Sequence, residues 1–240
     1  MAATFQTLNA VYTEVRRLTN KDSTTLPDAT LLPVANRRYL ELVREIIDTD
    51  DSWYAEIDTQ NFTVDDGTYT IPADDTASTY GGGAVKIIRV EVTYDGTNWV
   101  VVQPISRKEM TDFGITLGSD TDAILDNFSE SYPRYYHFGA SIKIVPTPNT
   151  TRTNGLRIFN IARPNELTSS SSIPDIPKDF LGVLCDGLLY DFYREFQRFT
   201  EAKESKQDWL GGLANMRSLM QSRTTEDVAP VLQKRKQNYH

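Results

Sequence analysis

The sequence predicts an α+β protein: a four-helix core from both chain ends, with an inserted antiparallel β-region and an extended C-terminal arm. Apolar residues recur at helical spacing near both ends of the chain. Between Trp53 and about Ile161 they alternate instead, and turn residues separate the runs. Beyond Thr224 no period remains. We therefore expect a helical core of 1–51 and 176–223, a β-region of 52–165, a linker of 166–175 and an arm of 224–240.

The composition of the chain limits the classes of partner that it is expected to bind. Its 240 residues carry a formal net charge of −8, so the protein as a whole should repel DNA. No apolar run approaches the roughly 20 residues of a membrane span, so no membrane partner is expected. The first residues lack the charged and apolar regions of a secretory signal. The single cysteine, Cys185, leaves no internal disulfide framework and fits a reducing compartment.

Two helices are expected before the β-region. The first covers residues 4–19, with Thr4 as N-cap, and its apolar stripe contains Phe5, Leu8, Val11, Tyr12, Val15 and Leu18. The second covers 30–48, with Pro33 in its first turn, where a missing N–H is tolerated. Its expected buried face consists of Ala35, Tyr39, Leu42, Val43 and Ile46. Its expected outward face consists of Arg37, Arg38, Glu41, Arg44 and Glu45, with the two glutamates flanking Arg44.

The β-region should consist of hairpins. Turn residues 65–67 and Asp95-Gly96 each separate two alternating runs, 53–64 from 68–72 and 84–94 from 98–105. A third hairpin is expected from 134–138 and 142–145, and a further strand from 155–164. Residues 106–131 should form a short helix with loops. The aromatic residues of 134–138 favour cross-strand packing over a nucleic-acid or sugar platform, because acidic residues precede them.

Two more helices should follow a flexible connector rich in serine and proline. The first spans 178–199, and the width of its apolar face indicates burial against more than one partner. Gly182 and Gly187 within it indicate the close approach of another backbone. The second spans 201–223 and carries Trp209, Leu210, Leu213, Met216, Leu219 and Met220.

The residues offer few means of catalysis. His137 lies in an expected strand and His240 is the last residue, so no pair of histidines has the spacing of zinc ligands. Cys185 lies on an apolar helical face, where a thiol is usually inert. The glycines of 81–83 precede no Lys-Ser/Thr pair and read as a loop rather than a phosphate cradle. We expect no catalytic residue, no cofactor and no metal site.

The C-terminal segment is a candidate docking segment. It combines apolar side chains with cations but lacks the periodicity of an element that folds alone. The candidate contact residues are Val228, Pro230, Val231, Leu232, Lys234, Arg235, Lys236 and Tyr239. A frayed terminus is the alternative interpretation.

The order of several motifs resembles the head-to-tail adaptor proteins of tailed double-stranded DNA bacteriophages. Helix "LLPVANRRYLELVREI" precedes a strand opened by Trp53, and "GTYTIPAD" is similar to that family's "Y-x-L-P-x-D" strand end. "IKIVPTPNTT" followed by "LRIFNIARP" resembles its "I-x-L-x-P-x-P" hairpin and next strand. "IPDIPKDFLGVLCDGLLYDFYREF" resembles its proline-led helix, and the trailing segment resembles its C-terminal arm. Residues 106–131 do not match the pattern.

The resemblance implies a structural protein of the virion neck, assembled in the host cytoplasm. It implies a homo-oligomeric ring, a dodecamer in well-known cases, that docks on the portal protein through the arm. The β-region would point toward a tail or stopper protein, and DNA would pass through the lumen without sequence-specific binding. An acidic lumen would let DNA slide, because few phosphate contacts would form. The alternatives are a soluble enzyme or carbohydrate-binding module with a β-rich active face, or another assembly protein such as a stopper.

Overall fold

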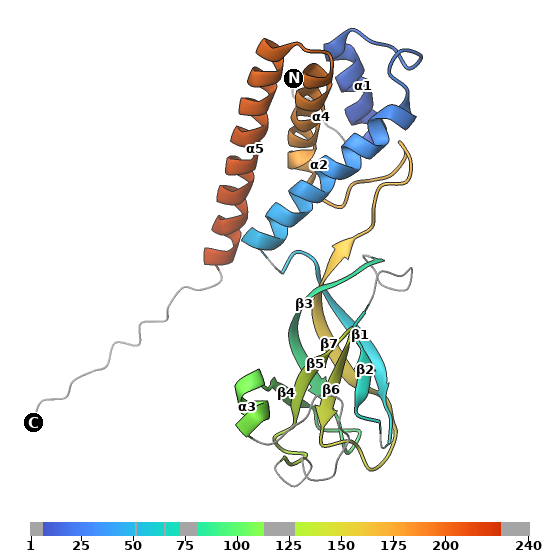
Figure 1. Cartoon of the computed structure of the whole chain (residues 1–240), viewed down its shortest axis with the longest axis vertical. Coiled ribbons are helices and arrows are strands. Elements are labelled where there is room, and N and C mark those ends of the chain that lie inside the picture. Colours follow the sequence, from blue (N-terminus) through green and yellow to red (C-terminus); the bar gives the residue numbers. More distant parts are fainter. Residues whose placement is uncertain (1–6, 51, 65, 73–80, 113–127, 227–240) are drawn as a thin grey trace, which may run out of the picture. The chain divides into compact units, whose positions relative to one another are not determined.

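The computed structural model describes residues 7–50, 52–64, 66–72, 81–112 and 128–226. The chain divides into two compact units. We call residues 1–53 with 166–240 the helical unit and residues 54–165 the sheet unit. Figure 1 shows the long helices in the first and the strands in the second. The predicted α+β class is confirmed.

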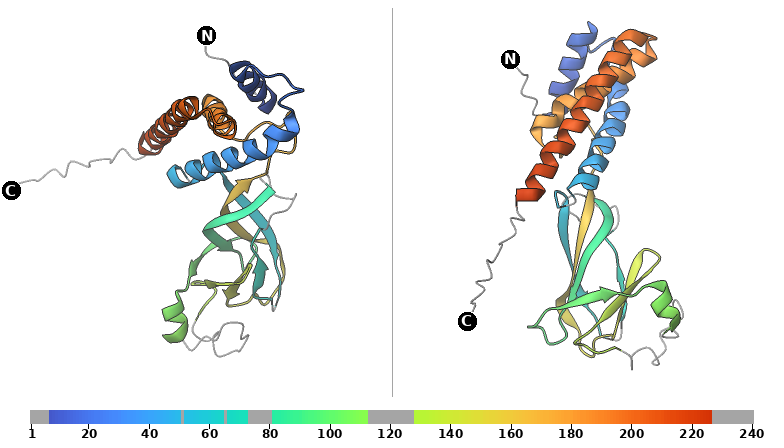
Figure 2. Two further views of the ribbon diagram at one scale, coloured as in Figure 1. Left: turned by 45° about the horizontal axis from the view of Figure 1, so that its top comes forward. Right: turned by 90° about the vertical axis from the view of Figure 1, so that its left-hand side faces the viewer.

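The helical unit contains four long helices. They are α1 (Leu8–Thr19), α2 (Asp28–Thr49), α4 (Leu181–Glu195) and α5 (Phe199–Glu226), with a 3-10 turn at Lys178–Phe180 before α4. Helix α4 contacts the other three, and α5 also contacts α2, as Figures 1 and 2 show. The expected inner face of α2 is confirmed, because Ala35, Tyr39, Leu42, Val43 and Ile46 are all buried.

Two details at the starts of these helices differ from the prediction. The N-cap of α1 is Thr7, whose hydroxyl accepts a hydrogen bond from the Ala10 N–H at 3.4 Å, so the predicted cap at Thr4 is wrong. Helix α2 begins at Asp28, and Pro33 therefore lies inside it rather than in its first turn. The earlier start has a physical cause: the Asp28 carboxylate favours a helix N-terminus and is held by the Arg16 guanidinium at 2.5 Å.

The segment before α4 is fixed to α2, although the sequence predicts a flexible connector there. The Asn36 side-chain amide donates to the Leu167 carbonyl at 2.8 Å and accepts from the Leu167 N–H at 2.7 Å. The Tyr39 hydroxyl accepts from the Asp175 N–H at 3.3 Å. Two side chains of α2 thus satisfy backbone groups of a segment that has no regular structure of its own.

The sheet unit holds one sheet of seven strands in the order β1-β7-β3-β4-β5-β6-β2. The strands are β1 (Ala55–Phe62), β2 (Thr68–Thr70), β3 (Gly81–Val92), β4 (Val100–Pro104), β5 (Arg134–Phe138), β6 (Ser141–Val145) and β7 (Arg152–Pro164). All neighbours pair antiparallel except β4 and β5, which pair parallel. The prediction of an antiparallel region is therefore wrong at one pairing. Strand β4 ends at Pro104 and β5 begins at Arg134, so enough residues separate them in sequence for a parallel pair, and α3 (Arg107–Asp112) is among them.

The first predicted hairpin is wrong, whereas the other two are confirmed. Strand β1 pairs with β7 and β2 pairs with β6, so the two strands lie at opposite ends of the sheet order. The pairs β3–β4 and β5–β6 form as expected. At the β3–β4 turn, the Asp95 carboxylate accepts the Asn98 and Thr97 N–H groups at 2.7 Å each, and these bonds hold its pKa well below the usual range.

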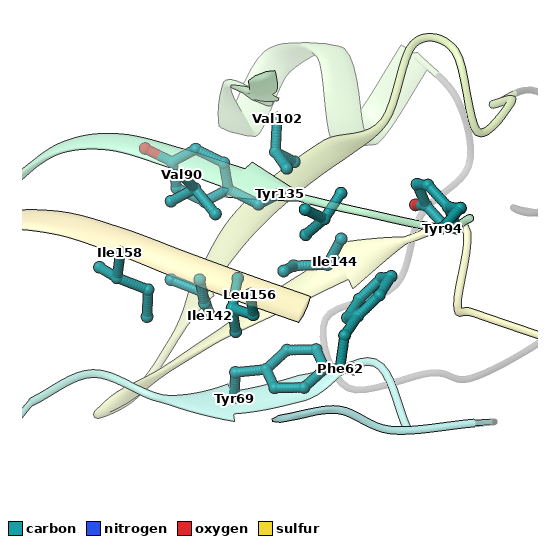
Figure 3. Close-up of a cluster of buried hydrophobic side chains, with 11 residues drawn as sticks. Phe62, Tyr69, Val90, Tyr94, Val102, Tyr135, Ile142, Ile144, Leu156 and Ile158 are labelled. Carbon is teal, nitrogen blue, oxygen red and sulfur yellow. The ribbon is translucent and has the colours of Figure 1, made fainter. Parts of the chain in front are cut away.

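The sheet curls around its main core. Its edge strands approach each other, since the Gln60 side-chain amide on β1 donates to the Thr70 carbonyl on β2 at 2.7 Å. Figure 3 shows the enclosed side chains, which come from all seven strands. They include Phe62, Tyr69, Val90, Val102, Tyr135, Ile142, Ile144, Leu156 and Ile158. Tyr136 is buried on the opposite face against Val145, so the two tyrosines of β5 pack as predicted, whereas Phe138 is 42% exposed.

Gly187 on α4 is expected to tolerate no larger residue. A Cβ there would lie 2.8 Å from the Trp209 ring and 3.2 Å from Arg38 Cδ, so the close neighbour is a side chain rather than the predicted backbone. Gly187→Ala should lower the free energy of unfolding by about 1–3 kcal/mol through overpacking. Gly211→Ala on α5 is the control, because nothing lies within 4 Å and the helix should gain roughly 0.5–1 kcal/mol. Denaturant melts of both variants would check this, and equal stabilities would contradict it.

Candidate interaction surfaces

A buried ion pair joins the helices of the helical unit. The Arg38 guanidinium donates to both carboxylate oxygens of Asp191 at 2.6 and 2.7 Å, and to Glu41 at 2.6 Å. Arg38 is only 9% exposed, so the prediction that it faces solvent is wrong. The predicted flanking of Arg44 by glutamates is also wrong, because Glu41 contacts Arg38 and Glu45 contacts Arg217 on α5. In both cases an oppositely charged residue from the other end of the chain binds the side chain: Asp191 binds Arg38, and Arg217 binds Glu45.

The residues around this pair stabilise the charged forms of both Arg38 and Asp191. The Arg38 guanidinium lies over the rings of Tyr190 at 5.2 Å and Trp209 at 5.4 Å. Burial acts to raise the pKa of Asp191, but hydrogen bonds from Arg38 and Arg37 outweigh it and hold the pKa below its usual value. The cluster therefore joins α2 to α4 through charge-assisted hydrogen bonds and reaches Trp209 on α5 through a cation–π contact, which is a structural role.

Cys185 and His137, the residues considered above for catalysis, belong to different units. Cys185 is buried in the helical unit, and His137 is exposed on β5, with its ring 5.8 Å from that of Tyr135. Within the described ranges, no three histidine, cysteine or acidic side chains gather so as to hold a metal ion.

Cys185 should be unreactive in the folded protein. Burial raises the pKa of its thiol to about 12, so about one thiol in ten thousand is ionised at pH 8. We expect Ellman's reagent at pH 8 to label the native chain only as fast as it unfolds, and to label it at once in guanidinium chloride. Rapid stoichiometric labelling of the native chain would contradict this.

The predicted arm contacts lie outside the described residues. Helix α5 continues through the expected start of the arm to Glu226. The candidate residues all follow it: Val228, Pro230, Val231, Leu232, Lys234, Arg235, Lys236 and Tyr239.

The outer face of the sheet carries an exposed apolar surface that the sequence reasoning missed. We call Ile57, Ile88, Arg89, Val101, Arg157 and Phe159 the sheet patch. Ile57, Phe159 and Arg89 lie opposite one another on β1, β7 and β3. Five of the six residues, all except Arg157, line a groove of 720 Å³. The adjacent isoleucines Ile87 and Ile88, which interrupt the alternation of β3, were the available sequence signal.

Two arginines cover the aromatic rings of this face. The Arg89 guanidinium lies 4.3 Å from the centre of the Phe159 ring and 3.1 Å from the Glu91 carboxylate. The Arg157 guanidinium lies 3.7 Å from the centre of the Trp99 ring. A sugar stacks on an open aromatic face, and an arginine occupies one face of each of these rings.

A second exposed apolar cluster lies in the helical unit around the α4–α5 turn. Phe196 and Phe199 are 52% and 69% exposed, although Phe196 belongs to the wide apolar face that the sequence predicts for 178–199. The Lys21 ammonium lies 5.8 Å from the Phe196 ring, and the Tyr193 hydroxyl donates to the Leu18 carbonyl at 3.4 Å. Phe196 follows the last residue of α4, where the chain turns away from the core.

Exposed apolar surfaces on the described residues are candidate sites for contacts with other proteins. The family model of the SU10 adaptor protein matches residues 6–234, and the chain belongs to this family of phage head-to-tail adaptors. A search of curated proteins found no match. The family is structural, and membership makes the chain a phage virion component. None of the described helices combines the length and apolar character of a membrane span.

Proposed function

We propose that the chain is the subunit of a homo-oligomeric ring, a dodecamer, that docks on the portal protein and joins the DNA-filled head to the tail. The observation that carries the proposal is the family match over residues 6–234, which spans both units and reaches into the arm. On its far side the ring would meet a tail or stopper protein. Its place is the virion neck, after assembly in the host cytoplasm.

Each subunit would contribute a four-helix core, made by α1, α2, α4 and α5, with the sheet unit as an insertion. Contacts of α4 with α1, α2 and α5 support this core, and so does the buried Arg38–Asp191 pair. The proposed boundaries are 1–51 and 176–223 for the core and 52–165 for the insertion. Residues 166–175 would connect the two, and 224–240 would form the arm.

DNA would pass through the lumen without sequence-specific contacts. The formal net charge of −8 supports this, because an acidic ring forms few contacts with phosphates. Few counterions would then be released from the DNA, and the main driving force for DNA binding would be absent. The covered rings of Trp99 and Phe159 and the buried Tyr135 and Tyr136 weigh against the alternative of a carbohydrate-binding module.

Electron microscopy of the purified chain mixed with the portal of the same phage tests the proposal. We expect rings seated on one end of the portal, with matching symmetry. The chain without portal is the control. The proposal requires that the chain associates with portal, whether or not the free chain is oligomeric. Chains that remain free at micromolar concentrations of both proteins would overturn the proposal.

A further inference from the structure

We propose that Asp186 makes the contact between α4 and α5 sensitive to pH, so that the two helices are held together more firmly when its carboxyl group is protonated than when it is ionised. Asp186 belongs to α4, which contacts α1, α2 and α5. Helix α5 runs beside α4 and continues in sequence into the arm (Figure 2). The inference concerns packing within one chain and does not depend on the proposed ring.

Helices α4 and α5 are in close contact on both sides of Asp186. A Cβ on Gly187 would lie 2.8 Å from the Trp209 ring, and a Cβ on Gly212 would lie 2.7 Å from the Val183 side chain. Val183 and Gly187 thus both face α5, and Asp186 lies between them on the same helix. Because its side chain is only half-buried, Asp186 lies at the edge of this contact.

The Asp186 carboxylate lies near another negative charge and has no cation as a partner. Among the described residues, none donates a hydrogen bond to Asp186 or forms an ion pair with it. Burial, together with a smaller effect of the Asp208 carboxylate on α5, raises the pKa of its carboxyl group to about 6. Ionisation of Asp186 therefore places like charges on both helices of a close contact.

The cations of the neighbouring elements do not neutralise Asp186. The charged groups that these elements bring to α4 are Glu14 and Arg17 on α1, Arg37, Arg38 and Glu41 on α2, Lys206 and Asp208 on α5, and Lys178 and Asp179 in the 3-10 turn. Arg17 is bound to Glu14, and both arginines of α2 are bound to Asp191. The Lys206 ammonium lies 5.9 Å from the centre of the Tyr190 ring, and Lys178 precedes the start of α4. Asp208 is the charged neighbour that acts on Asp186.

The pH effect of Asp186 has the opposite sign to that of Asp191 on the same helix. Asp191 is bound by two arginines, so its ionised form stabilises the fold. For Asp186 the folded-state pKa of about 6 lies above the unfolded value of about 4, so the folded chain binds more protons between these two values. The stability that protonated Asp186 contributes is therefore fully present below about pH 4 and is lost as the pH rises through about 6.

Urea denaturation of the full-length chain at pH 4.5, 6 and 7.5 tests the inference, with Asp186→Asn as the variant. Asparagine has nearly the same shape but carries no charge at any of these pH values. The ratio of the wild-type unfolding constant to that of the variant should rise by about tenfold or more between pH 4.5 and 7.5, since one pKa unit corresponds to a factor of ten. A ratio that is the same at all three pH values would overturn the inference.

Two further variants serve as controls. Asp48→Asn removes an exposed carboxylate of the same unit, 3.9 Å from Arg44, and its ratio to wild type should change little with pH. Asp208→Asn should reduce the pH effect without abolishing it, because the burial of Asp186 remains the larger cause.

Hydrogen exchange followed by mass spectrometry gives a second readout that starts from the wild-type chain. After correction for the intrinsic pH dependence of exchange, peptides from α4 and α5 should be more strongly protected at pH 5 than at pH 7.5. Asp186→Asn should lack this difference, and peptides from the sheet unit are the internal control. Wild-type helices without the pH effect would overturn the inference, and so would an effect of equal size in the variant. The proposed function stands in either case.

Discussion

Asp191→Ala is expected to lower the free energy of unfolding by about 3–5 kcal/mol, because it leaves the Arg38 guanidinium buried without its main partner. Typical domains are stable by only about 5–15 kcal/mol, so the variant should be close to unfolding at room temperature. Chemical denaturation followed by far-UV circular dichroism would measure the loss, since the ion pair lies among the helices that dominate the signal.

The control is Asp48→Ala on the same helical unit. Asp48 lies 3.9 Å from Arg44 with both side chains largely exposed, and such surface pairs contribute about 0–1 kcal/mol. The double variant Arg38→Met with Asp191→Leu should recover most of the stability, because two apolar side chains leave no buried charge. If Asp191→Ala and Asp48→Ala had equal free energies of unfolding, the Arg38–Asp191 pair would not stabilise the fold as proposed.

The same pair predicts a dependence on pH. The folded-state pKa of Asp191 is lowered, so the stability that its ionisation contributes is present above its unfolded pKa of about 4. That contribution is lost as the pH falls through the folded pKa. The difference between wild type and Asp191→Ala should therefore be constant near neutral pH and shrink below about pH 4. A difference that grows on acidification would contradict the assignment.

The local parts of the fold were predictable from the sequence. The buried face of α2 repeats at helical spacing, and helical hydrogen bonds connect residues only four apart, so the chain itself carries the information. The turn at Asp95-Gly96 is equally local, because Gly96 has a φ of +82° and Asp95 binds the next backbone N–H groups.

The parts that depend on distant partners were not predictable in this way. Arg38 looked like a surface residue because Asp191 lies 153 positions away in sequence. The turn at 65–67 suggested that β1 and β2 pair, but β1 pairs with β7 and β2 pairs with β6, both of which follow much later in the sequence. Leu210 fits the apolar character of α5 yet is 52% exposed, because periodicity does not say how much of a wide face a neighbour covers.

The two candidate contact surfaces, the arm and the sheet patch, also differ in whether the sequence alone predicts them. The arm could be proposed from composition alone, because a segment without a period but with apolar anchors and cations reads as a docking segment. The sheet patch needed the register of β1, β7 and β3, since only strand pairing places Ile57, Phe159 and Arg89 in one row. A single strand sequence does not contain that information.

Deleting residues 227–240 is expected to abolish attachment to portal while changing the melting temperature little. The deletion leaves the whole of α5 in place, including its buried Trp209, Met216 and Met220. The segment carries apolar anchors in Val231 and Leu232 and a cluster of cations at 234–236. Its fourteen residues could span about 46–50 Å when extended, enough to leave the parent subunit and reach along a portal. Co-sedimentation with portal and a thermal melt measure the two effects.

Variants of the arm separate its two kinds of contact. Val231→Ser with Leu232→Ser should weaken attachment at every salt concentration. Changing Lys234, Arg235 and Lys236 to glutamine should weaken it mainly at low salt, because screening already reduces charge contacts at high salt. A chain whose last fourteen residues are shuffled keeps their composition and is the control for non-specific charge; it should fail to attach. Because the proposed ring would repeat a weak contact in every subunit, partial losses per arm should multiply into loss of the complex. Truncated chains that still co-sediment, or that no longer fold, would exclude the segment as the docking arm.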